Sequence, residues 1–229
     1  MTSAAVLAWY VVAPHLEPQR VWVEIAIVAL AVLPGTLLLV LIALPLWSRR
    51  WLIAAAVALA LIAFGCTEAG WGLAANFAKL WAAVFAGWAF VRLFEELSWV
   101  ALIAVIVPIV DVLSVWRGPT RSITSHHIHV YENVAIAFLA PGGPFYFGPP
   151  DILFYALFLA AAQRWNLRVV WTWVSCTGMY GVAIATAYAV HKNGIAALPF
   201  LSFGFLAPNA DLLWRSIRSG RSSSAAAAP

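Results

Sequence analysis

Residues Val21–Trp47 read VWVEIAIVALAVLPGTLLLVLIALPLW, and Glu24 is the only charged residue in this run. A helix needs about 20 apolar residues to cross a bilayer, so the run is long enough to span one. Backbone groups in lipid must be paired within the protein, which predicts a helix here. The long Ala, Val and Leu runs of the chain lack the short alternating strands of a membrane barrel.

The composition of the whole chain agrees with a membrane environment. Of its 229 residues, 64% are hydrophobic and only 10% are charged, and the mean hydropathy is +0.92. A soluble domain carries roughly 25% charged residues, so this chain has too little polar surface to cover a soluble globule. The net charge of +4 comes from scattered basic residues rather than a basic stripe, which argues against nucleic-acid binding.

The hydropathy pattern predicts an all-α polytopic membrane protein with about seven transmembrane helices. Trp and Tyr cluster at the ends of the apolar segments, as at membrane interfaces. A further stretch, Ala4–Ala13, is interpreted as an N-terminal half-crossing or an interfacial helix. The seven expected membrane segments are Val21–Trp47, Trp51–Ala69, Trp71–Leu93, Ser98–Trp116, Gly148–Ala162, Val169–Val190 and Ile195–Leu213.

One stretch, Val134–Pro150, does not fit a simple helix. The sequence Pro141-Gly-Gly-Pro144 interrupts it, and Gly148-Pro-Pro150 interrupts it again. Irregular backbone at membrane depth persists only where protein or a water-filled cavity surrounds it. The stretch is therefore either a re-entrant, site-lining segment or a loop on the interface, and both interpretations stay open.

Two of the three aspartates lie in apolar surroundings. Asp111 lies within VIVPIVDVLSVW (105–116), and Asp151 opens DILFYALFL (151–159). An intramembrane carboxylate costs at least about 2.5 kcal/mol, so each indicates a functional site. The chain leaves the membrane after Trp116 and returns before Asp151, so the two helices are antiparallel with both carboxylates toward the same face. The third, Asp211, is expected at an interface, paired with Arg215 four positions on.

Two carboxylates that meet in a low dielectric share a proton instead of both ionising. The ionised member can act as a general base on water, and the protonated member can polarise a peptide carbonyl. This is the chemistry of an aspartic protease, and it needs no metal or cofactor. Burial alone is equally consistent with a buried polar contact or with a proton-coupled transporter.

The sequence around these residues resembles one family. Three motifs occur in the order VDVLSV followed by GPTR (110–115, 118–121), FGPPDILFY (147–155) and AALP (196–199). Together they resemble the presenilin and signal peptide peptidase family of GxGD-type intramembrane aspartyl proteases. The resemblance covers residues 98–205, and the chain is similar to small, divergent, prokaryote-like members.

The resemblance implies roles for particular residues. Asp111 and Asp151 would be the catalytic pair of an aspartic endopeptidase, and Gly148 with Ala197, Leu198 and Pro199 would contact substrate. The substrates would be single-span membrane proteins or remnant signal peptides, presented as an unwound strand that often pairs with a strand edge near these motifs. No cofactor is implied. The expected organisation is N-terminal membrane helices (1–97), a catalytic membrane core (98–214) and a disordered tail (215–229).

Three positions depart from the family pattern. Pro150 replaces the second glycine of GxGD, Ala196 replaces the first proline of Pro-Ala-Leu, and Val110 stands where the family usually has tyrosine. A catalytically inactive relative that acts as a membrane scaffold therefore stays open, as does a proton-coupled transporter. Transporters usually show an internal repeat with paired broken helices, and the sequence shows none.

The histidine cluster is the strongest candidate for a metal site. His126, His127 and His129 could bind zinc, but their spacing is not that of a helical ligand pair, so a solvated loop is favoured and no metal is expected. Cys66 and Cys176 both lie in apolar stretches and are interpreted as packing residues.

The distribution of charge predicts the orientation. With seven crossings, most arginines, including those near the C-terminus, lie on one side of the membrane. The positive-inside rule then places the C-terminus in the cytoplasm and the histidine-containing loop on the far side. The expected location is the plasma membrane of a prokaryote, as a multi-pass protein.

Overall fold

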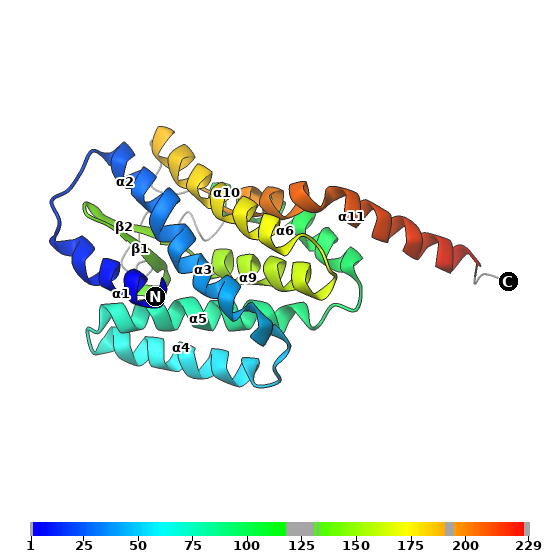
Figure 1. Cartoon of the computed structure of the whole chain (residues 1–229), viewed down its shortest axis with the longest axis horizontal. Helices are drawn as coiled ribbons and strands as arrows, with labels where there is room; N and C mark the ends of the chain where they lie inside the picture. Colours follow the sequence, from blue (N-terminus) through cyan, green and yellow to red (C-terminus); the bar gives the residue numbers. More distant parts are fainter. Residues whose placement is uncertain (1, 118–130, 132, 191–194, 227–229) are drawn as a thin grey trace.

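Helices make up most of the chain (Figure 1). The computed structural model describes residues 2–117, 131, 133–190 and 195–226. Short 3-10 turns follow α1 (η1, Ala13–His15) and α3 (η3, Leu44–Ser48), and a π-helical turn (η2, Val28–Val32) joins α2 to α3. The α-helices are α1 (Thr2–Val12), α2 (Val21–Ile27), α3 (Leu33–Ala43), α4 (Leu52–Glu68), α5 (Gly72–Val91), α6 (Leu97–Arg117), α9 (Pro149–Arg164), α10 (Val169–Ala189) and α11 (Leu198–Ala226).

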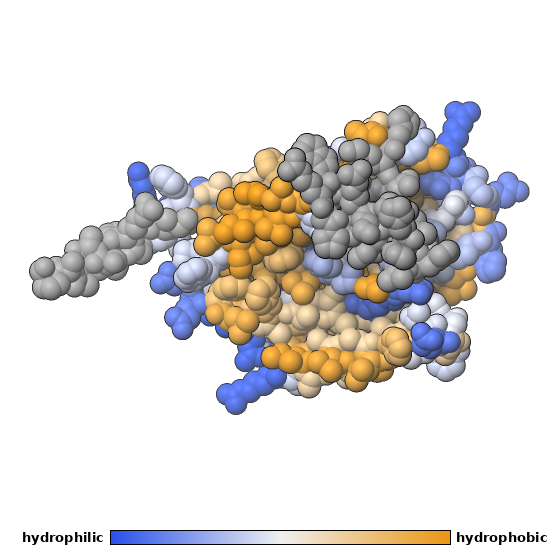
Figure 2. All heavy atoms as spheres, turned by 180° about the vertical axis from the view of Figure 1, so that it is seen from behind, coloured by the Kyte–Doolittle hydropathy of each residue, from blue (hydrophilic) through white to orange (hydrophobic). Residues whose placement is uncertain are grey.

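Among the described residues, four helices are long and apolar enough to cross a membrane: Val21–Ser48, Gly72–Val91, Leu97–Ser114 and Val169–Ala189. The chain is therefore a multi-pass integral membrane protein. Every segment predicted from hydropathy contains a helix, but that all seven cross the bilayer stays a prediction. Hydrophobic side chains also cover large parts of the surface (Figure 2), as lipid-facing helices require.

Helix α9 lies at the centre of the bundle, between α5, α10 and α11 (Figure 1). Its residues from Tyr155 to Ala162 are fully buried. Close packing against α5 depends on Gly87, where an added Cβ atom would clash with the Leu153 carbonyl oxygen. The helix that carries Asp151 is thus held by protein on several sides.

The stretch expected to be re-entrant or a loop is in fact a β-hairpin, so the all-α expectation is wrong here. Strands β1 (Ile136–Ala140) and β2 (Gly143–Phe147) pair antiparallel, with Ala140 opposite Gly143 across the turn Pro141-Gly142. Alternate side chains of β1 are buried against the helices. Because the residues between them are also apolar, the period-2 pattern of a strand is hidden in the sequence.

Helix α11 runs past the body of the bundle (Figure 1). It continues as helix to Ala226, where the sequence predicts a disordered tail from residue 215. Alanine has the highest intrinsic helix propensity, which favours continuation through this Ser- and Ala-rich stretch.

Candidate functional site

Asp111 and the start of α11 meet although 87 residues separate Asp111 from Leu198. The backbone N–H of Leu198 donates a hydrogen bond to Asp111 Oδ2 at 3.0 Å. Ala197 and Leu198 are both buried. The structure thus brings the Ala197-Leu198-Pro199 segment to the first aspartate of the pair, which hydropathy could not have shown.

Asp151 lies in the first turn of α9, where Gly148 is the N-cap. The Gly148 N–H donates to Asp151 Oδ2 at 2.9 Å, and the Asp151 N–H donates to the Gly148 carbonyl at 3.0 Å. Pro149 and Pro150 take the first two helical positions, whose N–H groups have no partner within the helix, so their missing donors cost little. Pro150 is therefore compatible with the helix start that carries Asp151.

Nothing in the local backbone requires a glycine at residue 148. Its φ of −67° and ψ of 151° suit any residue, and a Cβ there would contact Asp151 Oδ2 at an ordinary 3.4 Å. If Gly148 has the expected role in admitting substrate, the reason is its missing side chain beside Asp151 and not its backbone conformation.

The two carboxylates share one electrostatic environment. The charge of Asp111 acts on Asp151, and both charges act on the phenol of Tyr131. Burial, with a smaller contribution from these two charges, raises the pKa of Tyr131 to about 12. Both aspartates are partly buried. Within the part of the chain that the structure describes, neither forms an ion pair with a lysine or arginine.

Two tyrosines at this site could not be predicted from the sequence. Tyr131 lies near both aspartates, and its ring contacts that of Tyr146. Tyr180 of α10 donates its hydroxyl to the Asp151 backbone carbonyl at 2.6 Å and packs on Phe147 of β2. Aromatic residues are common in membrane segments, so neither residue carries a signal of its own in the sequence.

A groove of about 700 Å³ lies beside the aspartate helix. Small side chains of α4 and α5, among them Ala60 and Ala83, line it, and Pro149, Pro150 and Leu153 form its end on α9. A helix occupies roughly 120 Å³ per residue, taking a 10 Å diameter and 1.5 Å rise. The groove therefore accommodates a short or extended segment rather than a whole spanning helix.

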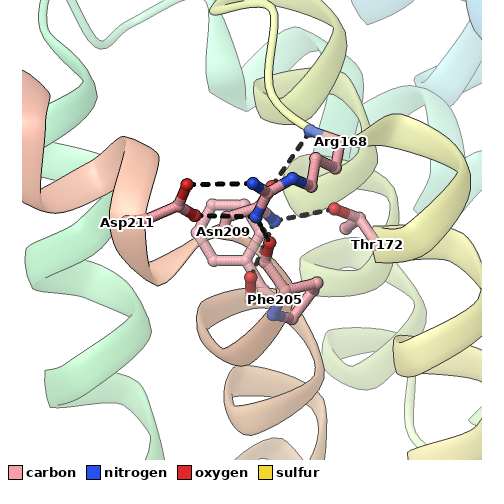
Figure 3. Close-up of polar contacts among 6 residues, drawn as sticks. Arg168, Thr172, Phe205, Asn209 and Asp211 are labelled. Atoms are coloured by element: carbon pink, nitrogen blue, oxygen red, sulfur yellow. Dashed lines mark hydrogen bonds and ion pairs between the residues drawn. The ribbon is translucent and has the colours of Figure 1, made fainter.

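The third aspartate lies at the other end of α9 and has different partners (Figure 3). Asp211 forms a two-point ion pair with Arg168, with N–O distances of 2.7 and 2.9 Å, so the predicted pair with Arg215 is wrong. Asn209 accepts a hydrogen bond from the Arg168 N–H and donates to Thr172 Oγ1. The start of α10 lies against α11. The ion pair therefore joins two helices, whereas the predicted pair of Asp211 with Arg215 would have lain within α11.

Comparison with family models, curated proteins and solved structures finds no match. The chemistry of the site therefore has to be inferred from its own residues.

Some sequence predictions lie outside the described residues. They include the Gly118–Arg121 motif and the three histidines, His126, His127 and His129. Among residues that the structure does describe, no three His, Cys, Asp or Glu side chains lie together as a metal site would require. Cys66 and Cys176 are free thiols, the first partly buried and the second buried.

Proposed function

We propose that this chain is an intramembrane aspartyl protease of the presenilin and signal peptide peptidase type. It would hydrolyse peptide bonds in single-span membrane proteins, including remnant signal peptides. The observation that carries the proposal is that Asp111 on α6 accepts a hydrogen bond from Leu198 of the third motif, while α6 also contacts α9, the helix that carries Asp151. A spanning helix that carries an uncompensated carboxylate is costly, which favours a functional reason for the pair.

The hydrogen bonds of the pair suit a shared-proton mechanism. In each carboxylate Oδ2 accepts a backbone N–H, from Leu198 at Asp111 and from Gly148 at Asp151, and among the described residues Oδ1 has no hydrogen-bond partner. One Oδ2 contact fixes each side chain, and Oδ1 is left for water or a proton. No described cation fixes either carboxylate in its ionised form.

The reaction follows from that arrangement. The ionised aspartate takes a proton from water as the water oxygen attacks the scissile carbonyl carbon, and the protonated aspartate donates a hydrogen bond to the carbonyl oxygen. The tetrahedral intermediate then collapses, the C–N bond breaks, and the amine leaves with a proton from the pair. The two carboxylates end with one proton between them, as they began.

The hairpin supports presentation of the substrate as a strand. Strand β2 ends at Phe147, directly before Gly148 and Asp151, and side chains from α1 and α5 occupy the outer edge of β1. A segment unwound from a substrate helix would then pair along β2, where strand addition supplies backbone hydrogen bonds.

The arginines suggest how the protein lies in the membrane. Arg92 donates to the Arg49 carbonyl, Arg164 donates to the Val91 carbonyl, and Arg168 pairs with Asp211. We call this end of the bundle the arginine end, defined by Arg49, Arg92, Arg164 and Arg168. The opposite end of α9, with β1, β2, Asp111 and Asp151, is called the hairpin end. By the positive-inside rule the arginine end and the C-terminus face the cytoplasm of a prokaryotic cell, and the aspartates lie nearer the far side.

The test is cleavage of a generic single-span substrate by the purified chain in detergent. Asp111→Asn and Asp151→Asn keep an oxygen that can accept the Leu198 or Gly148 N–H, so the fold should persist. Each should lower the cleavage rate on the order of 10³-fold. Asp211→Asn is the matched control and should cleave normally.

Other outcomes point to the alternatives. Full activity in either site variant would rule out the carboxylate pair. If the unmodified chain does not cleave but drives proton-coupled solute flux in liposomes, the same aspartates belong to a transporter. If it does neither, the scaffold interpretation of the fold is favoured.

A further inference from the structure

Side chains of two helices, and not another strand, bind the backbone groups along the outer edge of β1. In an antiparallel pair, the N–H and C=O of every second residue point away from the partner strand. With Ala140 opposite Gly143 at the turn, Ala137 and Leu139 are such residues. A strand edge with unpaired backbone groups is a liability that proteins usually cover.

Asn76 of α5 covers this edge as a neighbouring strand would. Its Oδ1 accepts the Ala137 N–H at 2.7 Å, and its Nδ2 donates to the Ala137 carbonyl at 2.9 Å. One side-chain amide thus pairs with both backbone groups of one strand residue. Asn76 is only 8% exposed, so neither bond competes freely with water.

Three more side chains bind carbonyls along the same edge. Lys79 Nζ donates to Ala135 at 3.1 Å, the Tyr10 hydroxyl to Ala137 at 3.0 Å, and Trp9 Nε1 to Leu139 at 2.9 Å. We call Trp9, Tyr10, Asn76 and Lys79 the edge clamp. Two of its members come from α1 and two from α5. An asparagine and a lysine within a membrane-spanning helix are costly, so the clamp needs a reason.

We propose that the edge clamp holds the hairpin in one register and position, and that Asn76 is thereby a positioning residue for peptide-bond hydrolysis at Asp151. This inference rests on the proposed protease function. A two-stranded hairpin alone is marginally stable, and β2 continues through Phe147 into Gly148, whose N–H holds Asp151 Oδ2. A hairpin that shifts would displace the substrate strand and this carboxylate together.

The clamp is tested first without any catalysis, by amide hydrogen exchange. In Asn76→Ala, the Ala137 N–H should exchange about tenfold faster or more, the loss expected when one buried hydrogen bond opens. Asn76→Asp keeps an acceptor for that N–H, so Ala137 should stay protected. Thr186→Ala removes only a hydroxyl bond within α10 and is the control. Unchanged exchange at Ala137 in Asn76→Ala would overturn the clamp.

The positioning role is tested by where the substrate is cut. Asn76→Ala should spread cleavage over neighbouring peptide bonds and lower kcat about 10- to 100-fold, with a smaller change in KM, because the reacting groups are misplaced rather than removed. Asn76→Asp should restore a single main cut. Tyr10→Phe, which removes one of the two donors to the Ala137 carbonyl, should show a smaller shift in the same direction and guards against a misfolded Asn76 variant.

The outcomes separate the two proposals. Faster exchange at Ala137 with unchanged cut sites and kcat would overturn the positioning role while the protease function stands. Absence of cleavage by the unmodified chain would overturn the protease function and the positioning role with it, and the exchange ratio would still decide whether the clamp exists.

Discussion

The hairpin end and the arginine end of the bundle hold their aspartates with different partners. At the arginine end both Asp211 oxygens face the guanidinium of Arg168. At the hairpin end Asp111 and Asp151 each accept one backbone N–H, and no ion pair reaches them within the described residues. A guanidinium fixes a carboxylate in its ionised form. A single amide donor orients the carboxylate and still lets it take up a proton.

The hydrogen-bond partners therefore distinguish Asp211 from the two aspartates proposed to act in hydrolysis better than their positions in the sequence do. Asp111 lies on α6 and Asp211 on α11, and both contact another helix. Only the contacts across the bundle show that Asp211 pairs with Arg168, whereas Asp111 has no cationic partner among the described residues.

The largest effect is expected when the aspartates of the hairpin end receive a cationic partner like that of Asp211. Tyr131→Arg would place a guanidinium where the charges of both aspartates act. It should lock the pair in its ionised form and lower cleavage on the order of 10²-fold or more. Tyr131→Phe keeps the ring without the charge and should retain most activity. A Tyr131→Arg variant that cleaves normally would show that the pair does not share a proton.

The next effect tests the amide donor itself. Leu198→Pro removes the N–H that binds Asp111, at the first residue of α11, where proline is tolerated. Leu198→Ala loses the same buried side chain but keeps the N–H. Cleavage should fall roughly tenfold further in the proline variant than in the alanine variant, as expected for one hydrogen bond to a charged group. Equal rates in the two variants would show that the contact has no role in the reaction.

The close contact between α5 and α9, which supports both ends of the bundle, is tested by its effect on the free energy of unfolding. Gly87→Ala would bring a Cβ into the Leu153 carbonyl oxygen, so α5 and α9 must separate. The cost should be about 1–3 kcal/mol of unfolding free energy. Gly65→Ala on α4, where no atom lies within 4 Å of the new Cβ, is the matched control and should be neutral or slightly stabilising. Thermal unfolding in detergent measures both, and equal melting temperatures would contradict the tight α5–α9 contact.

The smallest effect concerns the arginine end. The hydrogen bond from Arg168 lowers the pKa of Asp211 below its usual value. A carboxylate with a lowered folded-state pKa stabilises the fold above its unfolded pKa, about 3.9, and loses that contribution as the pH falls through the lower value. The stability of Asp211→Asn should thus lie slightly below the wild type at neutral pH and match it in acid. Both side chains are 45% exposed, so the difference is small. A difference that grows in acid would show the opposite sign of linkage.

The helices could be predicted well from the sequence because each membrane segment carries its own apolar run. The predicted stretch Val169–Val190, for example, differs by one residue from α10. The sequence also predicts Asp111 and Asp151 toward one end of antiparallel helices, and α6 and α9, which carry them, are in contact. That the two act as a catalytic pair stays a prediction.

The hairpin and its partners could not be predicted in the same way. Both faces of β1 are apolar, and Pro144 within β2 argues against a strand, although it lies next to the turn. The bonds of the edge clamp join residues from 56 to 130 positions apart. Such pairings depend on how the helices pack, which periodicity within one segment does not describe.

The edge clamp has a consequence for synthesis of the chain on the ribosome. Trp9 and the strand residue that it binds, Leu139, are 130 residues apart. At about 5–20 residues per second, roughly 7–26 s pass between their appearance. While α2 to α6 are made, the Trp9 indole and the Tyr10 hydroxyl of α1 therefore cannot yet form their hydrogen bonds to β1. Closing the outer edge of β1 therefore joins a helix made early to a strand made much later.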